Sequence, residues 1–280
     1  MNPDLSLRLM AAVEHMPAFP KSVEQILALT RDVSCSPKDL VQVINRDPVV
    51  TIKVLRVVNS AYYGLAKQIT SVDHAVVFLG FNTIKNLALS MAAIGMLPSS
   101  PLSGFDGQRY LMHSMATAAI ARQLAQRMPD ADANDCFIAG LLHDFGKVVV
   151  AQFMPTDFRK SMELSLWQGL PLHQAFQEVI GVDHAQVGAM LAEKWRFPPD
   201  LVQTIRYQHE PESSDTPMMA AMVAANQISK LLGFEFGGWL VIEELADCVA
   251  NRLGGKLENV KASLGDLGPL LNEAHVFSHL

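Results

Sequence analysis

The chain has 280 residues, of which 50% are hydrophobic and 18% are charged, and its formal net charge is -6. This length and apolar content suit one large domain or two modest ones, with some apolar surface left for a partner. The acidic balance argues against a general nucleic-acid binder, because such a protein needs a basic face to neutralise phosphates.

The cysteines and the apolar stretches indicate the compartment. Cys35, Cys136 and Cys248 are scattered and form no CxxC motif, so they predict neither a disulfide framework nor a cysteine-bound metal. A reducing compartment fits this usage. The first residues lack the basic start and apolar run of a signal peptide, and the longest apolar stretches, such as residues 87–97, are interrupted. We therefore expect a cytoplasmic protein with no membrane segment.

Apolar residues recur at helical spacing through the first hundred residues. Asp47 precedes Pro48, and Ser36 precedes Pro37, so each pair places an N-cap before a proline at the first helical position. Asn82 is interpreted as the N-cap of the last helix in this half. The predicted helices are 5–16, 23–29, 37–44, 49–58, 72–79 and 83–96.

Residues 97–107, with Pro98, Pro101 and two glycines, are the best candidate for a boundary. We predict an N-terminal lobe over residues 1–97 and a second lobe over residues 108–280, packed against each other. Further helices are predicted over 110–128, 135–150, 171–180, 184–195, 199–207, 217–232 and 240–252, with one or two more in the tail. Because strand alternation is absent, the sequence predicts an all-α fold of two packed helical lobes.

One stretch places an imidazole beside a carboxylate. His143 and Asp144 lie between the apolar residues 138–142 and 148–150, which predicts that both are buried. An ionised aspartate is almost never fully buried without a partner, because the loss of hydration costs several kcal/mol. The two side chains could bind one divalent ion through nitrogen and oxygen. An equally simple interpretation is a salt-bridged core aspartate beside a hydrogen-bonded histidine.

Other histidines occur on separate predicted helices. His113, His184 and His209 have apolar or acidic neighbours that set them apart. The remaining histidines are interpreted as hydrogen-bonded core or surface residues without a metal role, because a lone histidine on a helix is most often of that kind. They are His15, His74, His173, His275 and His279.

The pattern resembles the HD superfamily of metal-dependent phosphohydrolases, whose His…His-Asp signature matches His113, His143 and Asp144. The run 143–147, followed by His184 and His209, is similar to the HD-GYP branch, although the GYP loop is absent after His209. The N-terminal half is more specifically similar to the HDOD domain. The matching stretches are 16–20, 44–48, 58–64, 78–81 and 181–188, and the resemblance covers residues 14–228.

This resemblance implies an HD-like C-terminal lobe with a set of candidate metal ligands. They are His113, His143, Asp144, His184, His209 and Asn226. Asn226 stands where the superfamily has its last aspartate, and Gln208 stands where the HD-GYP pattern has another histidine. Both changes weaken the site, so we expect one ion or fewer per chain, with Fe, Mn, Zn or Ni as candidates. If the site is active, Asp144 and Lys147 are the catalytic candidates, with Lys147 neutralising phosphate charge. The alternative for Lys147 is a helix-surface lysine paired with an acid.

The HDOD resemblance implies a bacterial signalling or regulatory protein with little or no hydrolase activity. The alternative is an active metal-dependent phosphohydrolase that acts on a phosphate ester or a cyclic dinucleotide. The expected partner is a protein or a small signalling ligand. A second copy of this chain, which would give a homodimer, is one candidate for the protein partner. The candidate partner surface is Asn59, Ser60, Tyr62 and Tyr63. The plainer interpretation is that Asn59 caps a helix and the tyrosines only pack.

Overall fold

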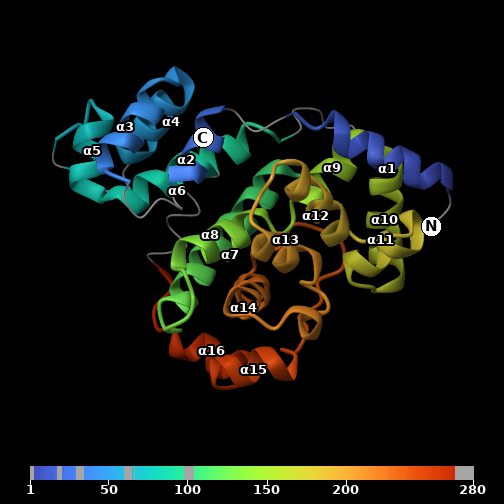
Figure 1. Ribbon diagram of the computed structural model, residues 1–280. Coiled ribbons are helices and arrows are strands. Elements are labelled where there is room, and N and C mark those ends of the chain that lie inside the picture. Colours follow the sequence, from blue (N-terminus) through green and yellow to red (C-terminus); the bar gives the residue numbers. More distant parts are fainter. Residues whose placement is uncertain are drawn as a thin grey trace. The chain divides into compact units, whose positions relative to one another are not determined.

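The computed structural model describes residues 3–17, 21–29, 35–59, 65, 67–97 and 104–268. Every regular element in this part of the chain is helical and none is a strand (Figure 1), which confirms the all-α fold class. The chain divides into two compact units. One is built from residues 18–97, and the other from residues 1–17 and 98–274.

The smaller unit contains α2 (Lys21–Leu29), α3 (Pro37–Asn45), α4 (Pro48–Val58), α5 (Val72–Leu79) and α6 (Phe81–Ile94). The predicted caps at Ser36 and Asp47 are confirmed: Ser36 pairs with Asp39 in a capping box, and the Asp47 carboxylate accepts the first free amides of α4. Asn82 does not cap a helix, because α6 begins one residue earlier. Gly80, with a φ of 86°, ends α5 and turns the chain directly into α6.

The partner surface predicted in this unit lies mostly outside the described residues, which include only Asn59 of its four members. The Asn59 amide donates to the carbonyls of Leu55 and Ile69, and its oxygen accepts from the Ile69 amide, at 2.7–2.8 Å. These bonds fasten the end of α4 to the segment that follows it. Asn59 therefore has a structural task here, and the partner surface stays a prediction.

The larger unit holds the remaining helices. They are α1 (Pro3–His15), α7 (Gly107–Ala125), α8 (Ala133–Leu142), α9 (Phe145–Phe153), α10 (Pro155–Gln168), α11 (Leu172–Ile180), α12 (His184–Lys194), α13 (Pro199–Arg206), the 3-10 helix η2 (Pro211–Ser214), α14 (Pro217–Leu231), α15 (Asp247–Leu253) and α16 (Leu257–Ser263). The sequence did not predict α10. The helix predicted over 240–252 is wrong in its first half, since the chain is irregular from residue 234 to 246.

Helix α1 packs on α9 and α12 of this unit. Its buried face includes Leu9 and Val13, and the Lys194 ammonium of α12 donates to the carbonyl of Val13 at 2.9 Å and of Met16 at 3.0 Å. The first 17 residues therefore group with the C-terminal unit, which differs from the predicted N-terminal lobe of residues 1–97. The packing of the two lobes against each other stays a prediction.

The centre of the larger unit is formed by α7, which packs on α8 and α14. Its buried residues include five alanines, and small side chains let helices approach closely. One stretch, Ala133–Phe153, is long and apolar enough to cross a membrane by length and composition, but 83% of its most apolar window is buried inside the protein. It comprises α8 and α9, and its burial in the core explains its apolar composition.

Candidate metal centre

The site begins at the break between α8 and α9. The sequence predicted one continuous helix over 135–150, but α8 ends at Leu142 and α9 begins at Phe145. Asp144 lies in the break with φ -97° and ψ 6°, and its side chain caps neither helix. Because the helix is interrupted here, His143 and Asp144 can point toward the same place. Adjacent residues of one continuous helix differ by about 100° in direction, so their side chains would converge less directly.

Two glycines, one on each side of this break, allow α8 and α9 to pack closely against other helices. A Cβ added to Gly140 of α8 would lie 2.6 Å from the Ala118 Cα of α7. A Cβ added to Gly146 of α9 would overlap the His184 carbonyl oxygen at the start of α12. The first contact brings His143 toward α7 and the second brings Asp144 toward α12. The glycine of the His-Asp-x-Gly-Lys run is therefore needed for helix packing.

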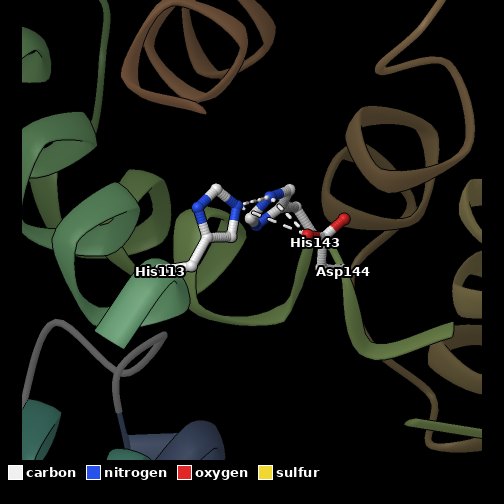
Figure 2. A group of neighbouring side chains, drawn as sticks. All are labelled: His113, His143 and Asp144. Atoms are coloured by element: carbon white, nitrogen blue, oxygen red, sulfur yellow. Dashed lines mark hydrogen bonds and ion pairs between the residues drawn. The ribbon is translucent and has the colours of Figure 1, made fainter. Parts of the chain in front are cut away.

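His113, His143 and Asp144 converge, as Figure 2 shows; we call this group the HD centre. The Nε2 atoms of His113 and His143 are 3.3 Å apart. The Oδ2 atom of Asp144 lies 3.4 Å from each of them. All three side chains are at most 2% exposed. These residues come from α7 and from the break after α8, so packing of the core places them together.

Hydrogen bonds on the far side of each ring determine which nitrogen carries the proton. His113 Nδ1 lies 2.7 Å from the Phe234 carbonyl oxygen, and His143 Nδ1 lies 2.8 Å from that of Gly140. A carbonyl only accepts, so a neutral imidazole at either position carries its hydrogen on Nδ1 and has a lone pair on Nε2. Two lone pairs and a carboxylate oxygen thus face one another. That arrangement can hold a shared cation, and histidine ligands usually donate their other N–H to a carbonyl in this way.

The distances in the HD centre also fit a metal ion. Ligands bound at the ~2.0–2.1 Å typical of zinc–nitrogen and zinc–oxygen bonds lie about 3.3–3.4 Å apart around a tetrahedral ion. The three measured separations are 3.3, 3.4 and 3.4 Å. The donor set therefore fits a borderline divalent ion such as Zn, Fe, Ni or Mn.

Further charged and imidazole groups extend the site toward a cavity. Asp144 Oδ1 lies 2.9 Å from His184 Nε2, and Asp144 Oδ2 lies 2.6 Å from Lys147 Nζ. His209 Nε2 is 3.4 Å from His184 Nε2. A small cavity is lined by these residues together with His113, Asn226 and Lys230. Five of the six predicted ligands therefore line one cavity, while His143 lies behind it.

Burial determines the charge states of these groups. Burial lowers the pKa of His143 to about 3, and it lowers the pKa of His184 and of His209 as well. The imidazoles are therefore neutral near pH 7, the form that binds metals. Burial opposes ionisation of Asp144, but its neighbours His143, Lys147 and His184 outweigh it and hold the pKa of the carboxyl well below its usual value. The site thus offers the neutral imidazoles of His143, His184 and His209 and the carboxylate of Asp144.

The two departures from the superfamily pattern lie in different places. Asn226 lines the cavity, is 7% exposed, and its Oδ1 has no hydrogen-bond partner in the described part of the chain. An unpaired buried carbonyl oxygen is available to a ligand or ion. Gln208 instead donates to the carbonyls of His143 and Ile205, at 2.8 and 3.1 Å, and is absent from the cavity lining.

Sequence reasoning missed three groups beside the site. His173 was read as an ordinary histidine, yet its ring stacks on that of His209 with centroids 3.9 Å apart. Glu243 comes from the irregular residues 234–246, where a helix was predicted. Lys230 lines the cavity one helical turn after Asn226. The i, i+4 spacing on α14 was the signal that could have found Lys230; His173 and Glu243 had none.

The HDOD domain family model matches residues 16–211, so the chain belongs to the HDOD domain family. A curated relative from Treponema pallidum, an "Uncharacterized protein", is 28% identical over 229 residues. That match covers 80% of this chain but only 44% of the relative, so the chain spans less than half of that protein.

Three solved structures share the fold. An HDOD domain protein with unknown function from Geobacter sulfurreducens has a TM-score of 0.79 at 22% identity, covering 98% of this chain and 96% of that one. A protein from Shewanella amazonensis SB2B named "Putative phosphohydrolase" has a TM-score of 0.73 at 24% identity, covering 95% and 96%. One from Marinobacter aquaeolei VT8 named "Putative signal transduction protein" has a TM-score of 0.78 at 25% identity, covering 98% and 66%.

Proposed function

We propose that this chain is a signal-transduction HDOD protein whose HD centre binds one divalent ion and catalyses little or no phosphate-ester hydrolysis. The observation that supports this most is Asn226, a neutral side chain on the cavity wall where the HD superfamily has a carboxylate. Asp144 is then the single anionic group of the HD centre. The structure from Marinobacter aquaeolei is named "Putative signal transduction protein", which is the same functional class.

A metal hydrolase must do more than hold an ion. The ion supplies Lewis-acid polarisation and lowers the pKa of a bound water, and the protein must orient that water and balance the charge of the transition state. In this chain Lys147 is ion-paired with Asp144 Oδ2 at 2.6 Å, the same oxygen that faces both imidazoles. Lys147 thereby stabilises the carboxylate instead of standing free for a phosphate.

The second candidate is an active phosphohydrolase on a phosphate ester or cyclic dinucleotide. It is favoured by the two lysines, Lys147 and Lys230, that line the same cavity as the HD centre. Ammonium groups are point-charge partners for phosphate oxygens. The name of the Shewanella amazonensis structure points to this class. The expected partner of the chain remains a protein or a small signalling ligand.

The test is hydrolysis of phosphomonoesters and cyclic dinucleotides with added Mn, Fe, Ni or Mg, for the wild type and Asp144→Ala. We expect turnover far below the usual enzyme range of about 1–10³ per second, and no difference between the two proteins. Metal-dependent turnover within that range, lost in Asp144→Ala, would overturn the regulatory proposal in favour of the hydrolase.

Restoring the missing carboxylate should strengthen metal binding. Asn226→Asp adds an anionic oxygen at a cavity position whose Oδ1 is unpaired, and we expect the dissociation constant for Mn²⁺ to fall about tenfold or more. The matched control is Asn251→Asp, which adds the same charge at an exposed position of the same unit. Isothermal titration calorimetry of the chelator-treated proteins measures the Mn²⁺ dissociation constant of each variant. Equal affinity in Asn226→Asp and wild type would show that position 226 does not face the ion.

A further inference from the structure

We propose that His173, His209 and Glu243 form a second divalent-cation site, the rim site, beside the HD centre. Each of the three offers a ligand atom, and these atoms lie within 4.8 Å of one another. All three side chains are partly exposed, unlike the fully buried HD centre. Two imidazoles and one glutamate are a donor set that proteins use for Zn²⁺.

The carboxylate of the rim site is positioned by α14. Gln227 accepts a hydrogen bond from the Glu243 amide at 3.0 Å and donates to Glu243 Oε2 at 3.2 Å. Gln227 directly follows Asn226, the residue that stands in place of the superfamily aspartate. Glu243 therefore supplies a carboxylate close to the helix position where the expected one is missing. It comes from the irregular residues 234–246, which carry no family motif.

The imidazoles of the rim site connect it to the HD centre. His209 Nε2 is 3.4 Å from His184 Nε2, whose ring reaches Asp144. His173 and His209 both line the cavity, whereas Glu243 lines a neighbouring, more open hollow along residues 242–258. An ion can thus reach the rim site from solvent without passing the HD centre.

One rearrangement accompanies binding. The rings of His173 and His209 are stacked with their planes 13° apart, and a lone pair lies in the plane of its ring. An ion shared by both rings needs one of them to turn about its side-chain torsions. Terminal torsions of histidine have broad minima, so such a turn costs little. We assign it to the partly exposed His173.

Lys230 is a positively charged side chain beside the rim site, and it competes with a bound metal ion. Its Nζ lies 4.0 Å from Glu243 Oε2 and donates to the Val241 carbonyl at 3.3 Å. A bound ion and Lys230 compete for the same carboxylate, so Lys230→Met should tighten metal binding at the rim site. If Glu243 serves only as the partner of Lys230, this change will leave metal affinity unaltered.

The test counts zinc ions per chain by mass spectrometry and titration of chelator-stripped protein. The rim site raises the expected count above the one ion or fewer that the sequence predicts, so we expect two ions for the wild type and one for Glu243→Gln or His173→Gln. The matched control is Glu235→Gln, which removes a cavity carboxylate outside the rim site and should retain two. Asp144→Asn should lose only the ion of the HD centre. A count that is the same in Glu243→Gln as in the wild type would overturn the rim site, whereas a wild-type count of one that falls to zero in Glu243→Gln would place the failure at the HD centre.

A second readout is independent of stoichiometry. Zinc at the rim site ties residues 234–246 to α11 and to the end of α13, so it should slow amide hydrogen exchange in that segment. The slowing should persist in Asp144→Asn and disappear in Glu243→Gln. Exchange that is unaffected by zinc in the wild type would contradict the proposal, whatever happens at the HD centre.

Discussion

Asp144→Asn will lower the affinity of the HD centre for Zn²⁺ or Mn²⁺ by about 100-fold or more. The substitution keeps the shape of the side chain and removes the single carboxylate that faces His113 and His143 at 3.4 Å. It also removes the charge that balances Lys147, at 2.6 Å. An asparagine amide is a poorer ligand for these ions and cannot pair with an ammonium as strongly.

The control for this change is Asp157→Asn. Asp157 is another nearly buried carboxylate of the same unit. It is ion-paired with Arg8 at 2.6 Å and does not line the cavity. It should affect stability without affecting metal affinity. Titration calorimetry in the Glu243→Gln background isolates the HD centre from the rim site. Equal affinities for Asp144→Asn and Asp157→Asn would remove Asp144 from the ligand set.

Gly146→Ala will destabilise the larger unit by about 3 kcal/mol or more and weaken metal binding with it. The added methyl group would overlap the His184 carbonyl oxygen and lie 2.7 Å from the Gly188 amide nitrogen. Both are backbone atoms, so α9 and α12 must separate to make room. That movement also pulls His184 away from Asp144.

Gly188→Ala provides a graded comparison for that prediction. Its added methyl group would lie 3.2 Å from Ile205 Cγ2 and 3.3 Å from the Gly146 backbone nitrogen, which is tight but needs a shift of only a few tenths of an ångström. We expect a cost of about 1 kcal/mol, measured by urea unfolding. If the two alanine variants unfold alike, close backbone contact at Gly146 is not what holds α9 against α12.

Sequence alone predicted the features that depend on neighbouring residues. The helix starts at Ser36 and Asp47 follow from local capping chemistry, and both are present. The break at His143 and Asp144 was not predictable, because residues 138–150 are apolar enough for one long helix. Packing of Gly140 on α7 and of Gly146 on α12 decides that geometry, and these contacts join distant parts of the chain.

The candidate site divides in the same way, into residues that the sequence could identify and residues that only the fold brings to the site. Motif residues such as His113 and His184 could be selected from the sequence because their neighbours match a family pattern. Glu243 could not, since it lies in a segment without regular structure and reaches the site through Gln227. Asn226 was identified as a lost carboxylate, but only the structure shows its unpaired oxygen at the cavity wall.

The central claim is that the facing lone pairs of His113, His143 and Asp144 are held together by a divalent ion. The most direct measurement is urea unfolding of chelator-stripped Glu243→Gln protein, with and without Zn²⁺ at 100 times its dissociation constant. The predicted result is a stabilisation of about 2.7 kcal/mol that is absent when His113 is also replaced by alanine. Unchanged stability on adding zinc would contradict the claim and leave these residues as a hydrogen-bonded part of the core.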